Sequence, residues 1–154
     1  MRYWLLKSEP STYSIDDLER DGTTCWDSIR NYQARNFMRD DMKPGDLALF
    51  YHSSTSPPGV AGIAEIVSEG YPDPSARDPG SDYYDAAATE DDPRWFMVDV
   101  AFVRKLPSLV SLEDLKSAPQ FDDMVVTGRS RLSVQPVEKR HFDAVIELAG
   151  LRVT

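Results

Sequence analysis

The chain has 154 residues, a single cysteine and a formal net charge of −9. This length predicts one domain spanning residues 1–154, and a hydrophobic fraction of 41% is enough to bury a core, which excludes a mainly disordered chain. The strong net acidity excludes a protein that holds nucleic acid by bulk electrostatic attraction. No apolar run approaches the roughly 20 residues of a membrane-spanning helix. The first residues lack a signal-peptide pattern, so we expect a cytoplasmic protein without membrane contact.

The charge is distributed unevenly along the chain. Residues 69–93 contain eight acids and one base, a local charge of −7 that leaves −2 for all other residues. Residues 70–93 are also rich in Pro, Asp, Gly and Ala and show no periodicity, so we call them the acidic loop; loops this long are functional or mobile. Residues 28–39 and 128–141 are locally basic, which indicates a small basic face or ordinary solvated charges.

The first half of the chain predicts strands and helices in alternation. Residues 3–6 form a short apolar strand, and Ser14 is a suitable N-cap for a helix that ends at Gly22. A second helix is expected over residues 31–41, and a turn follows at 43–46. Residues 47–52 and 59–67 then predict two strands joined by a hairpin loop.

The second half predicts one long strand and two more helices. Residues 95–103 alternate between two apolar faces, which favours a strand, and Ser111 is the N-cap of a short helix. A further strand is possible at 124–127, and Pro136 at the first helical position predicts a final helix that ends at Gly150. Together these elements predict an α+β fold, a mixed and mainly antiparallel sheet curled toward a barrel with short flanking helices.

Catalytic and metal-binding patterns are weak in this sequence. It has no P-loop, HExxH or GxSxG motif, and the single Cys25 cannot form an internal disulfide. Aromatic and hydrogen-bonding side chains instead collect in residues 26–36, 51–53 and 129–135, the kinds of groups that a pocket for a planar heterocycle needs. Core packing of Trp26 and helix capping by Asn31 are the alternative interpretations.

Long strings of the sequence resemble a known family. Residues 3–10 (YWLLKSEP), 26–36 (WDSIRNYQARN) and 131–137 (RLSVQPV) resemble the EVE domain of the thymocyte nuclear protein family, in the same order and over nearly the whole chain. The resemblance implies a PUA-like fold related to the YTH and ASCH domains. It further implies a small bacterial, monomeric, non-catalytic reader of a modified nucleobase, a 5-substituted cytosine in DNA or a modified base in RNA, without cofactor or metal.

The comparison with YTH domains implies a role for each candidate ligand-binding residue. Trp26 would stack on the base as the first wall of the pocket, and Arg35 or Arg131 would contact phosphate. Lys7 and Ser8 would form the floor of the pocket, and Ser28 and Asn31 would hydrogen-bond to the base edge. Tyr51 and Ser53 would lie where a strand opens onto the pocket, and Ser133 and Gln135 would belong to the segment that closes it. A second aromatic wall would have to come from the acidic loop, which offers Tyr71, Tyr83 and Tyr84.

Two other classes of function remain open at this stage. The acidic loop could dock a basic protein partner, and a small nucleotide-processing enzyme could use Asp27, Glu9 or His52 as general acid or base. If the protein binds nucleic acid, the acidic loop would repel a duplex and so favours a single flipped nucleotide over a broad groove contact.

Overall fold

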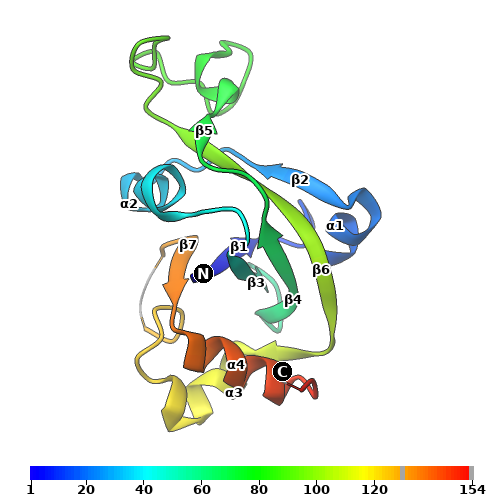
Figure 1. Ribbon diagram of the computed structural model, residues 1–154. Coiled ribbons are helices and arrows are strands. Elements are labelled where there is room, and N and C mark those ends of the chain that lie inside the picture. Colours follow the sequence, from blue (N-terminus) through cyan, green and yellow to red (C-terminus); the bar gives the residue numbers. More distant parts are fainter. Residues whose placement is uncertain (129–130, 153–154) are drawn as a thin grey trace.

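The computed structural model describes residues 1–128 and 131–152, which fold around one mixed sheet (Figure 1). The strand order is β2-β6-β4-β3-β1-β7, with β5 paired to β6; β1 and β3 run parallel, and the other pairs are antiparallel. The strands are β1 Tyr3–Ser8, β2 Thr23–Trp26, β3 Leu47–His52, β4 Gly59–Ile66, β5 Tyr71–Pro72, β6 Phe96–Ser111 and β7 Val134–Val137. The predicted α+β class and mixed, curled sheet are confirmed.

Short helices flank the sheet. They are α1 Ile15–Asp21, α2 Tyr32–Asn36, α3 Leu112–Ser117 and α4 Lys139–Leu148; a π-helical turn, Phe37–Asp41, extends α2, and 3-10 turns lie at Pro74–Arg77 and Pro119–Phe121. Ser14 and Ser111 each form a capping box, in which the serine hydroxyl accepts from the third helical amide and that residue's carboxylate accepts from the serine amide. The helix starts predicted at Ser14 and Ser111 are confirmed, because this capping chemistry is local.

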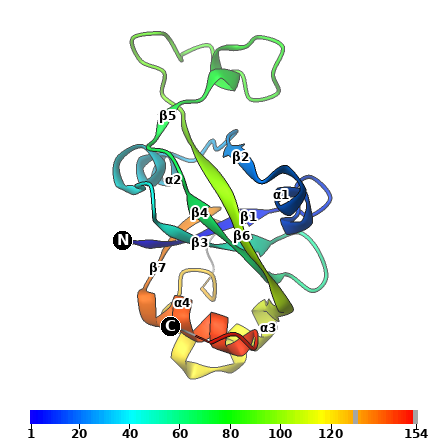
Figure 2. The same cartoon turned by 45° about the vertical axis from the view of Figure 1, so that its right-hand side comes forward.

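The sheet separates two hydrophobic cores. Leu6 and Phe50 point into the first core, where α1 and α2 pack, while their strand neighbours Leu5 and Leu49 point into the second. The helices α3 and α4 close the second core and lie together at the end of the molecule opposite the acidic loop (Figures 1 and 2). Strands β1 and β3 are therefore buried on both faces, which explains their unbroken apolar sequences.

Two predicted elements are wrong. Residues 124–127 form turns, in which the Thr127 hydroxyl donates to the carbonyls of Phe121 and Met124, and not a strand. Pro136 does not open a helix but pairs with Trp4 in β7, and α4 begins at Lys139. Proline is tolerated in β7 because that strand lies at the edge of the sheet, where a missing amide donor costs little.

The acidic loop leaves β5 and returns to β6, and it projects beyond the sheet in both ribbon views (Figures 1 and 2). Backbone hydrogen bonds fold it back on itself, from Asp85 to Ala76 and from Thr89 to Asp92. The long strand that follows, β6, extends eight residues beyond the predicted end at residue 103. Among the described residues no helix is long and apolar enough to cross a membrane.

Candidate nucleobase-binding site

A cavity of about 500 Å³ opens beside the ends of β1 and β2. It combines one large aromatic wall with hydroxyl and carboxylate groups, a composition typical of sites that orient a planar polar ligand. Twelve residues line this Trp26 cavity: Lys7, Ser8, Glu9, Thr12, Tyr13, Thr24, Cys25, Trp26, Asp27, Ser28, Ile29 and Tyr83.

Trp26 is both a core residue and a wall of the cavity. Its side chain is only 7% exposed and belongs to the first core, where its ring meets Phe50 edge to face at 5.5 Å between centroids. This packing fixes the plane of the indole before any ligand arrives. A preorganised ring of this kind binds a base with little loss of side-chain entropy.

The end of β1 forms the opposite side of the cavity. The Ser8 hydroxyl donates to the carbonyl of Tyr13 at 2.6 Å and so holds the loop between β1 and α1 in place. The amide of Lys7 donates to Ser133, and its ammonium lies 5.8 Å from the centroid of the Tyr51 ring. Burial lowers the pKa of Lys7.

Asp73 of the acidic loop anchors the segment after Trp26. Ser28 has a φ of 64°, in the left-handed region, and its amide donates to the buried Asp73 carboxylate at 2.7 Å. That carboxylate also accepts from the Ser75 amide and hydroxyl and pairs with Arg30 at 3.2 Å. Burial opposes its ionisation, but these donors outweigh burial and hold the pKa of Asp73 below its usual range.

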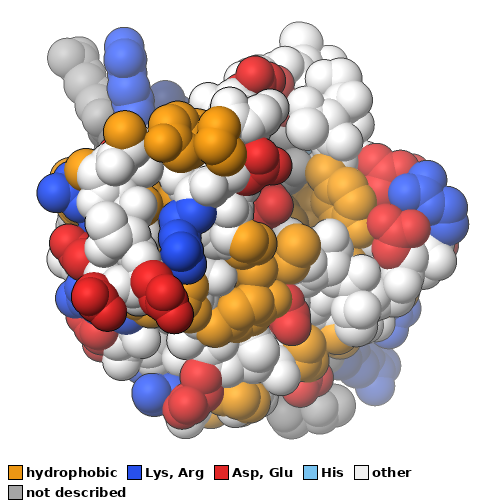
Figure 3. All heavy atoms as spheres, turned by 90° about the horizontal axis from the view of Figure 1, so that it is seen from above, with side chains coloured by type: hydrophobic (Ala, Val, Ile, Leu, Met, Phe, Trp, Pro, Cys, Tyr) orange, Lys and Arg blue, Asp and Glu red, His pale blue; other side chains and the backbone are white. Residues whose placement is uncertain are grey.

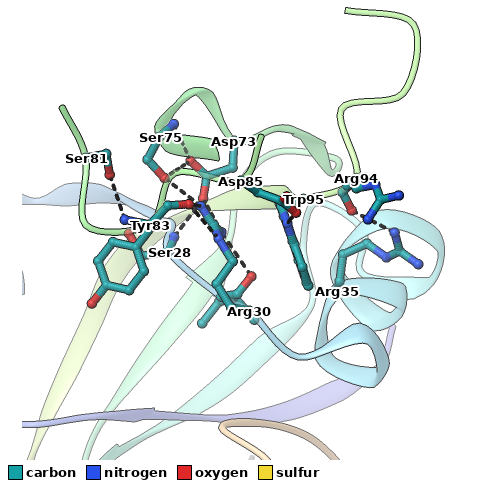
Figure 4. A network of polar contacts seen from close by, with 11 residues as sticks. Ser28, Arg30, Arg35, Asp73, Ser75, Ser81, Tyr83, Asp85, Arg94 and Trp95 are labelled. Atoms are coloured by element: carbon teal, nitrogen blue, oxygen red, sulfur yellow. Dashed lines mark hydrogen bonds and ion pairs between the residues drawn. The ribbon is translucent and has the colours of Figure 1, made fainter. Parts of the chain in front are cut away.

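Arg30 joins the acidic loop to the cavity (Figure 4). Its guanidinium donates to the carbonyl of Tyr83 at 2.9 Å and lies between the rings of Tyr83 and Trp95, at 5.6 and 5.2 Å from their centroids. Tyr83 is thereby held at the cavity lining. Of the three tyrosines considered for a second wall it alone lines the cavity: the Tyr71 hydroxyl donates to Asp99, and Tyr84 lies outside the lining.

The stack of rings and cations continues from Trp95 toward α2. Trp95 stacks on Tyr32 at 4.8 Å, and the Arg35 guanidinium lies 4.9 Å from the centroid of the same Tyr32 ring. Arg35 donates to the carbonyl of Arg94, and within the described part of the chain it makes no ion pair. Its charge is therefore held in place without a carboxylate of the described residues at ion-pair distance.

The structure brings four of the eleven sequence-predicted residues together, Lys7, Ser8, Trp26 and Ser28, and the other seven lie outside the cavity lining. Asn31 caps α2, its side-chain oxygen accepting from the Ala34 amide. Tyr51 is 3% exposed and packs in the second core. The amide of Ser53 donates to the carbonyl of Ser8, so Ser53 supports the cavity through the backbone.

The remaining predicted residues lie along α2 and around β7. Arg35 belongs to the stack on α2, and Arg131 is exposed. Ser133 accepts from the Lys7 amide, and the buried Gln135 side chain donates to the carbonyl of Leu132 at 2.7 Å. Residues 129 and 130, part of the predicted closing segment, lie outside the described residues.

The candidate acid–base and nucleophilic groups differ in their surroundings. Loss of hydration and the charge of Asp27 raise the pKa of Cys25, which keeps its thiol protonated. His52 accepts from the Ile15 amide at 3.1 Å, and burial lowers its pKa. Asp27 and Glu9 line the cavity, whereas Asp46 is buried elsewhere and accepts from the Trp4 indole. Four of the eight lining residues that the site prediction omitted, Glu9, Cys25, Asp27 and Ile29, adjoin predicted ones, so proximity in sequence was the available signal for these.

A second cavity, of about 360 Å³, lies on the other side of the molecule next to α4. It contains the buried His141 and the exposed carboxylates Asp123 and Glu138, whose potential ligand atoms all lie within 4.8 Å of one another. Arg140 donates to both carboxylates, and Asp123 also accepts from the His141 ring at 2.9 Å. Both carboxylates of this His141 cavity are therefore paired with one arginine that lies outside the cavity lining.

The chain was compared with known protein families and structures. The family model of the EVE domain matches residues 2–148. Human thymocyte nuclear protein 1 is 44% identical over 95% of this chain and 73% of its own length. A crystal structure of human THYN1 protein in complex with DNA containing 5-methylcytosine is 42% identical, with a TM-score of 0.92 over 99% of this chain and all of that chain.

The fold extends to a more distant group. The YTH domain of Zygosaccharomyces rouxii MRB1 protein, solved with N6-methyladenosine RNA, has a TM-score of 0.53 at 17% identity, covering 99% of this chain and 88% of that one. This likeness shows a shared fold, as the sequence resemblance implied.

Proposed function

The chain belongs to the EVE domain family, and from that premise we propose that it is a non-catalytic module that binds one modified nucleobase in the Trp26 cavity. The observation that carries the proposal is the cavity itself, where a preoriented indole, the Tyr83 side chain and several hydroxyl and carboxylate groups line about 500 Å³. The complex of human THYN1 with 5-methylcytosine DNA supports a 5-substituted cytosine as the base.

The base would enter the cavity flipped out of its strand. The acidic loop stands over the same side of the molecule, and its charge disfavours a duplex lying across it. Viewed from above, hydrophobic side chains and both signs of charge are interspersed, without a continuous basic field (Figure 3). Recognition of one extruded nucleotide, stacked and read at its edge, suits such a surface.

Arginines near the cavity would hold the flanking phosphates. Arg35 has no carboxylate partner within the described residues and is fixed by the Arg94 carbonyl and the Tyr32 ring. Arg131 is exposed beside β7 and is the alternative contact. One or two such contacts give a weak, salt-dependent contribution to affinity, and the base pocket supplies the rest.

The experiment is a titration of fluorescently labelled oligonucleotides, followed by anisotropy at low and physiological salt. The panel holds unmodified, 5-methylcytosine and 5-hydroxymethylcytosine DNA and N6-methyladenosine RNA. We expect saturable binding of one modified oligonucleotide. Failure of the folded protein to prefer any of them would overturn the proposal.

Substitutions at Trp26 test whether its ring stacks on the base, provided that the loss of its packing in the first core is measured separately. Trp26→Ala would open a hole in the first core and destabilise the protein by about 3–5 kcal/mol, so loss of binding by that variant is ambiguous. Trp26→Leu keeps much of the volume and removes the π-face, and we expect about a 10- to 100-fold loss of affinity. Trp26→Phe, with a smaller ring, should lose less. Unchanged affinity in a folded Trp26→Leu variant would contradict stacking.

A nucleotide-processing enzyme is the second candidate, because Glu9 and Asp27 line the same cavity. The raised pKa of Cys25 disfavours a thiolate nucleophile. Incubation with the modified oligonucleotides and separation of products decides between the two functions, since a binding module yields no new product.

Docking of a basic protein through the acidic loop is the third candidate. Asp73 and Asp85 are engaged by Arg30 and by the Trp95 indole, but Asp82, Glu90 and Asp91 are exposed. Replacing these three by Asn or Gln would abolish such docking and leave base binding intact. We also propose that the chain is one domain, monomeric and cytoplasmic, which size-exclusion chromatography and cell imaging would test.

A further inference from the structure

A protein that recognises 5-methylcytosine must reject thymine. Both bases carry a methyl group at position 5, so contact with the methyl does not separate them. They differ at position 4, where cytosine offers an amino donor and thymine a carbonyl acceptor. Discrimination therefore requires a hydrogen-bond acceptor in the cavity that meets position 4.

Two carboxylates line the Trp26 cavity, those of Asp27 and Glu9. Neither makes an ion pair within the described residues. Asp27 directly follows the stacking residue, and the next residue, Ser28, is pinned to the buried Asp73. Glu9 lies in the loop after β1, where its carbonyl accepts from the Thr12 and Tyr13 amides. Asp27 is thus the carboxylate whose backbone is tied to the aromatic wall.

We propose that Asp27 is the specificity-determining residue of the cavity, its carboxylate accepting a hydrogen bond from the exocyclic amino group of the base stacked on Trp26. The cavity then selects bases with an amino group at this edge, cytosine and its 5-substituted forms, over thymine and uracil. This inference rests on the proposed base-reading function and assigns the ligand class within it.

The surroundings of Asp27 favour such a partner. Loss of hydration and the charge of Asp73 raise the pKa of Asp27 and outweigh the opposing effects of Ser28, of the backbone amide of Asp27 and of the charge of Arg30. A hydrogen bond from an amino group would stabilise the ionised carboxylate of Asp27. A thymine carbonyl in the same place would leave two acceptors facing each other and no donor, and unpaired polar groups are the strongest source of discrimination between similar ligands.

The test uses two single-stranded oligonucleotides that differ only in 5-methylcytosine or thymine at one central position. Single strands remove the different cost of extruding a paired and a mispaired base. For the unaltered protein we expect at least about tenfold tighter binding of 5-methylcytosine. In Asp27→Asn the amide presents either a donor or an acceptor, so the ratio should fall to about one, with thymine binding gained as well as 5-methylcytosine binding lost. Asp122→Asn, at an exposed carboxylate outside the cavity lining, is the matched control and should keep the ratio.

The outcomes separate this inference from the function on which it rests. If the unaltered protein binds neither oligonucleotide, the proposed function fails and the inference with it. If it binds both equally, or if Asp27→Asn keeps the ratio while its unfolding midpoint matches that of Asp122→Asn, base binding stands and the role of Asp27 is overturned.

Discussion

The Trp26 cavity and the His141 cavity are both lined by carboxylates, but only in the His141 cavity does an arginine pair with them. In the His141 cavity Arg140 bonds to Asp123 and Glu138, and the imidazole is bonded as well. In the Trp26 cavity Asp27 and Glu9 make no ion pair within the described residues, and the nearby Arg30 is committed to Asp73 instead. Cavity size and acidic lining thus do not distinguish a binding site from a surface hollow. The distinction comes from the polar groups of the lining that are not already paired and can bind a ligand.

The largest expected effect comes from breaking the buried ion pair that shapes the Trp26 cavity. Asp73→Asn leaves Arg30 without its charge partner and weakens the anchor of the Ser28 amide, so the free energy of unfolding should fall by about 3 kcal/mol, measured by urea denaturation. Asp92→Asn, an exposed position of the same acidic loop, is the control and should change little. Equal effects of the two substitutions would mean that the anchor is not needed.

The same anchor predicts a dependence of stability on pH. The pKa values of Asp73 and Asp46 are held below their usual range in the folded state, in each case because hydrogen-bond donors outweigh burial. Their contribution is complete above the ordinary carboxyl pKa and is lost as the pH falls through the lowered folded values. Melting between pH 7 and pH 3 should therefore show a falling midpoint, and Asp73→Asn should flatten the curve. An unchanged slope in that variant would contradict the role of Asp73.

A smaller effect should separate phosphate contact from base contact beside the Trp26 cavity. Arg35→Gln removes one unneutralised cation, so the slope of log Kd against log salt should decrease by about one while the preference for the modified base is kept. The same substitution at Arg131 is the comparison. If neither slope changes, the phosphates lie elsewhere.

The smallest effect is expected at the His141 cavity. Arg140→Gln removes the bonds to Asp123 and Glu138 but touches nothing in the Trp26 cavity. Affinity for a modified oligonucleotide should change by less than about twofold, within the scatter of a titration. A larger loss would show that the two cavities are coupled and would contradict the assignment of binding to the Trp26 cavity alone.

Local chemistry made much of the fold predictable. The caps at Ser14 and Ser111 and the apolar strands at 3–6 and 47–52 depend on neighbouring residues alone, and all were found. Strands β2 and β7 were missed because each has four residues, and their pairing with β6 and β1 is decided by partners distant in sequence.

The candidate site likewise contains residues that the sequence identifies and residues that it misses. Trp26 and Ser28 were found through the resemblance of a continuous string, and Asn31 was correctly recognised as a possible cap. The neighbouring sequence does not mark Asp73 as the buried partner of Arg30. The two residues are 43 positions apart, and Asp73 is one acid among many in the acidic loop. Sequence also left the second wall open, and only the folded loop singles out Tyr83 as a lining residue.

The 16-residue strand β6 has a consequence for the dynamics of the whole molecule. Its first half pairs with β2 beside Trp26, and its second half pairs with β4 and leads into α3 at the far core. One strand therefore belongs to both cores, although two register shifts interrupt its ladder with β4, and neither core can open fully without disrupting β6. The central amides of β6 should exchange with solvent deuterium only through global unfolding, so a ligand bound at the Trp26 end will slow exchange at the distant end by the same factor.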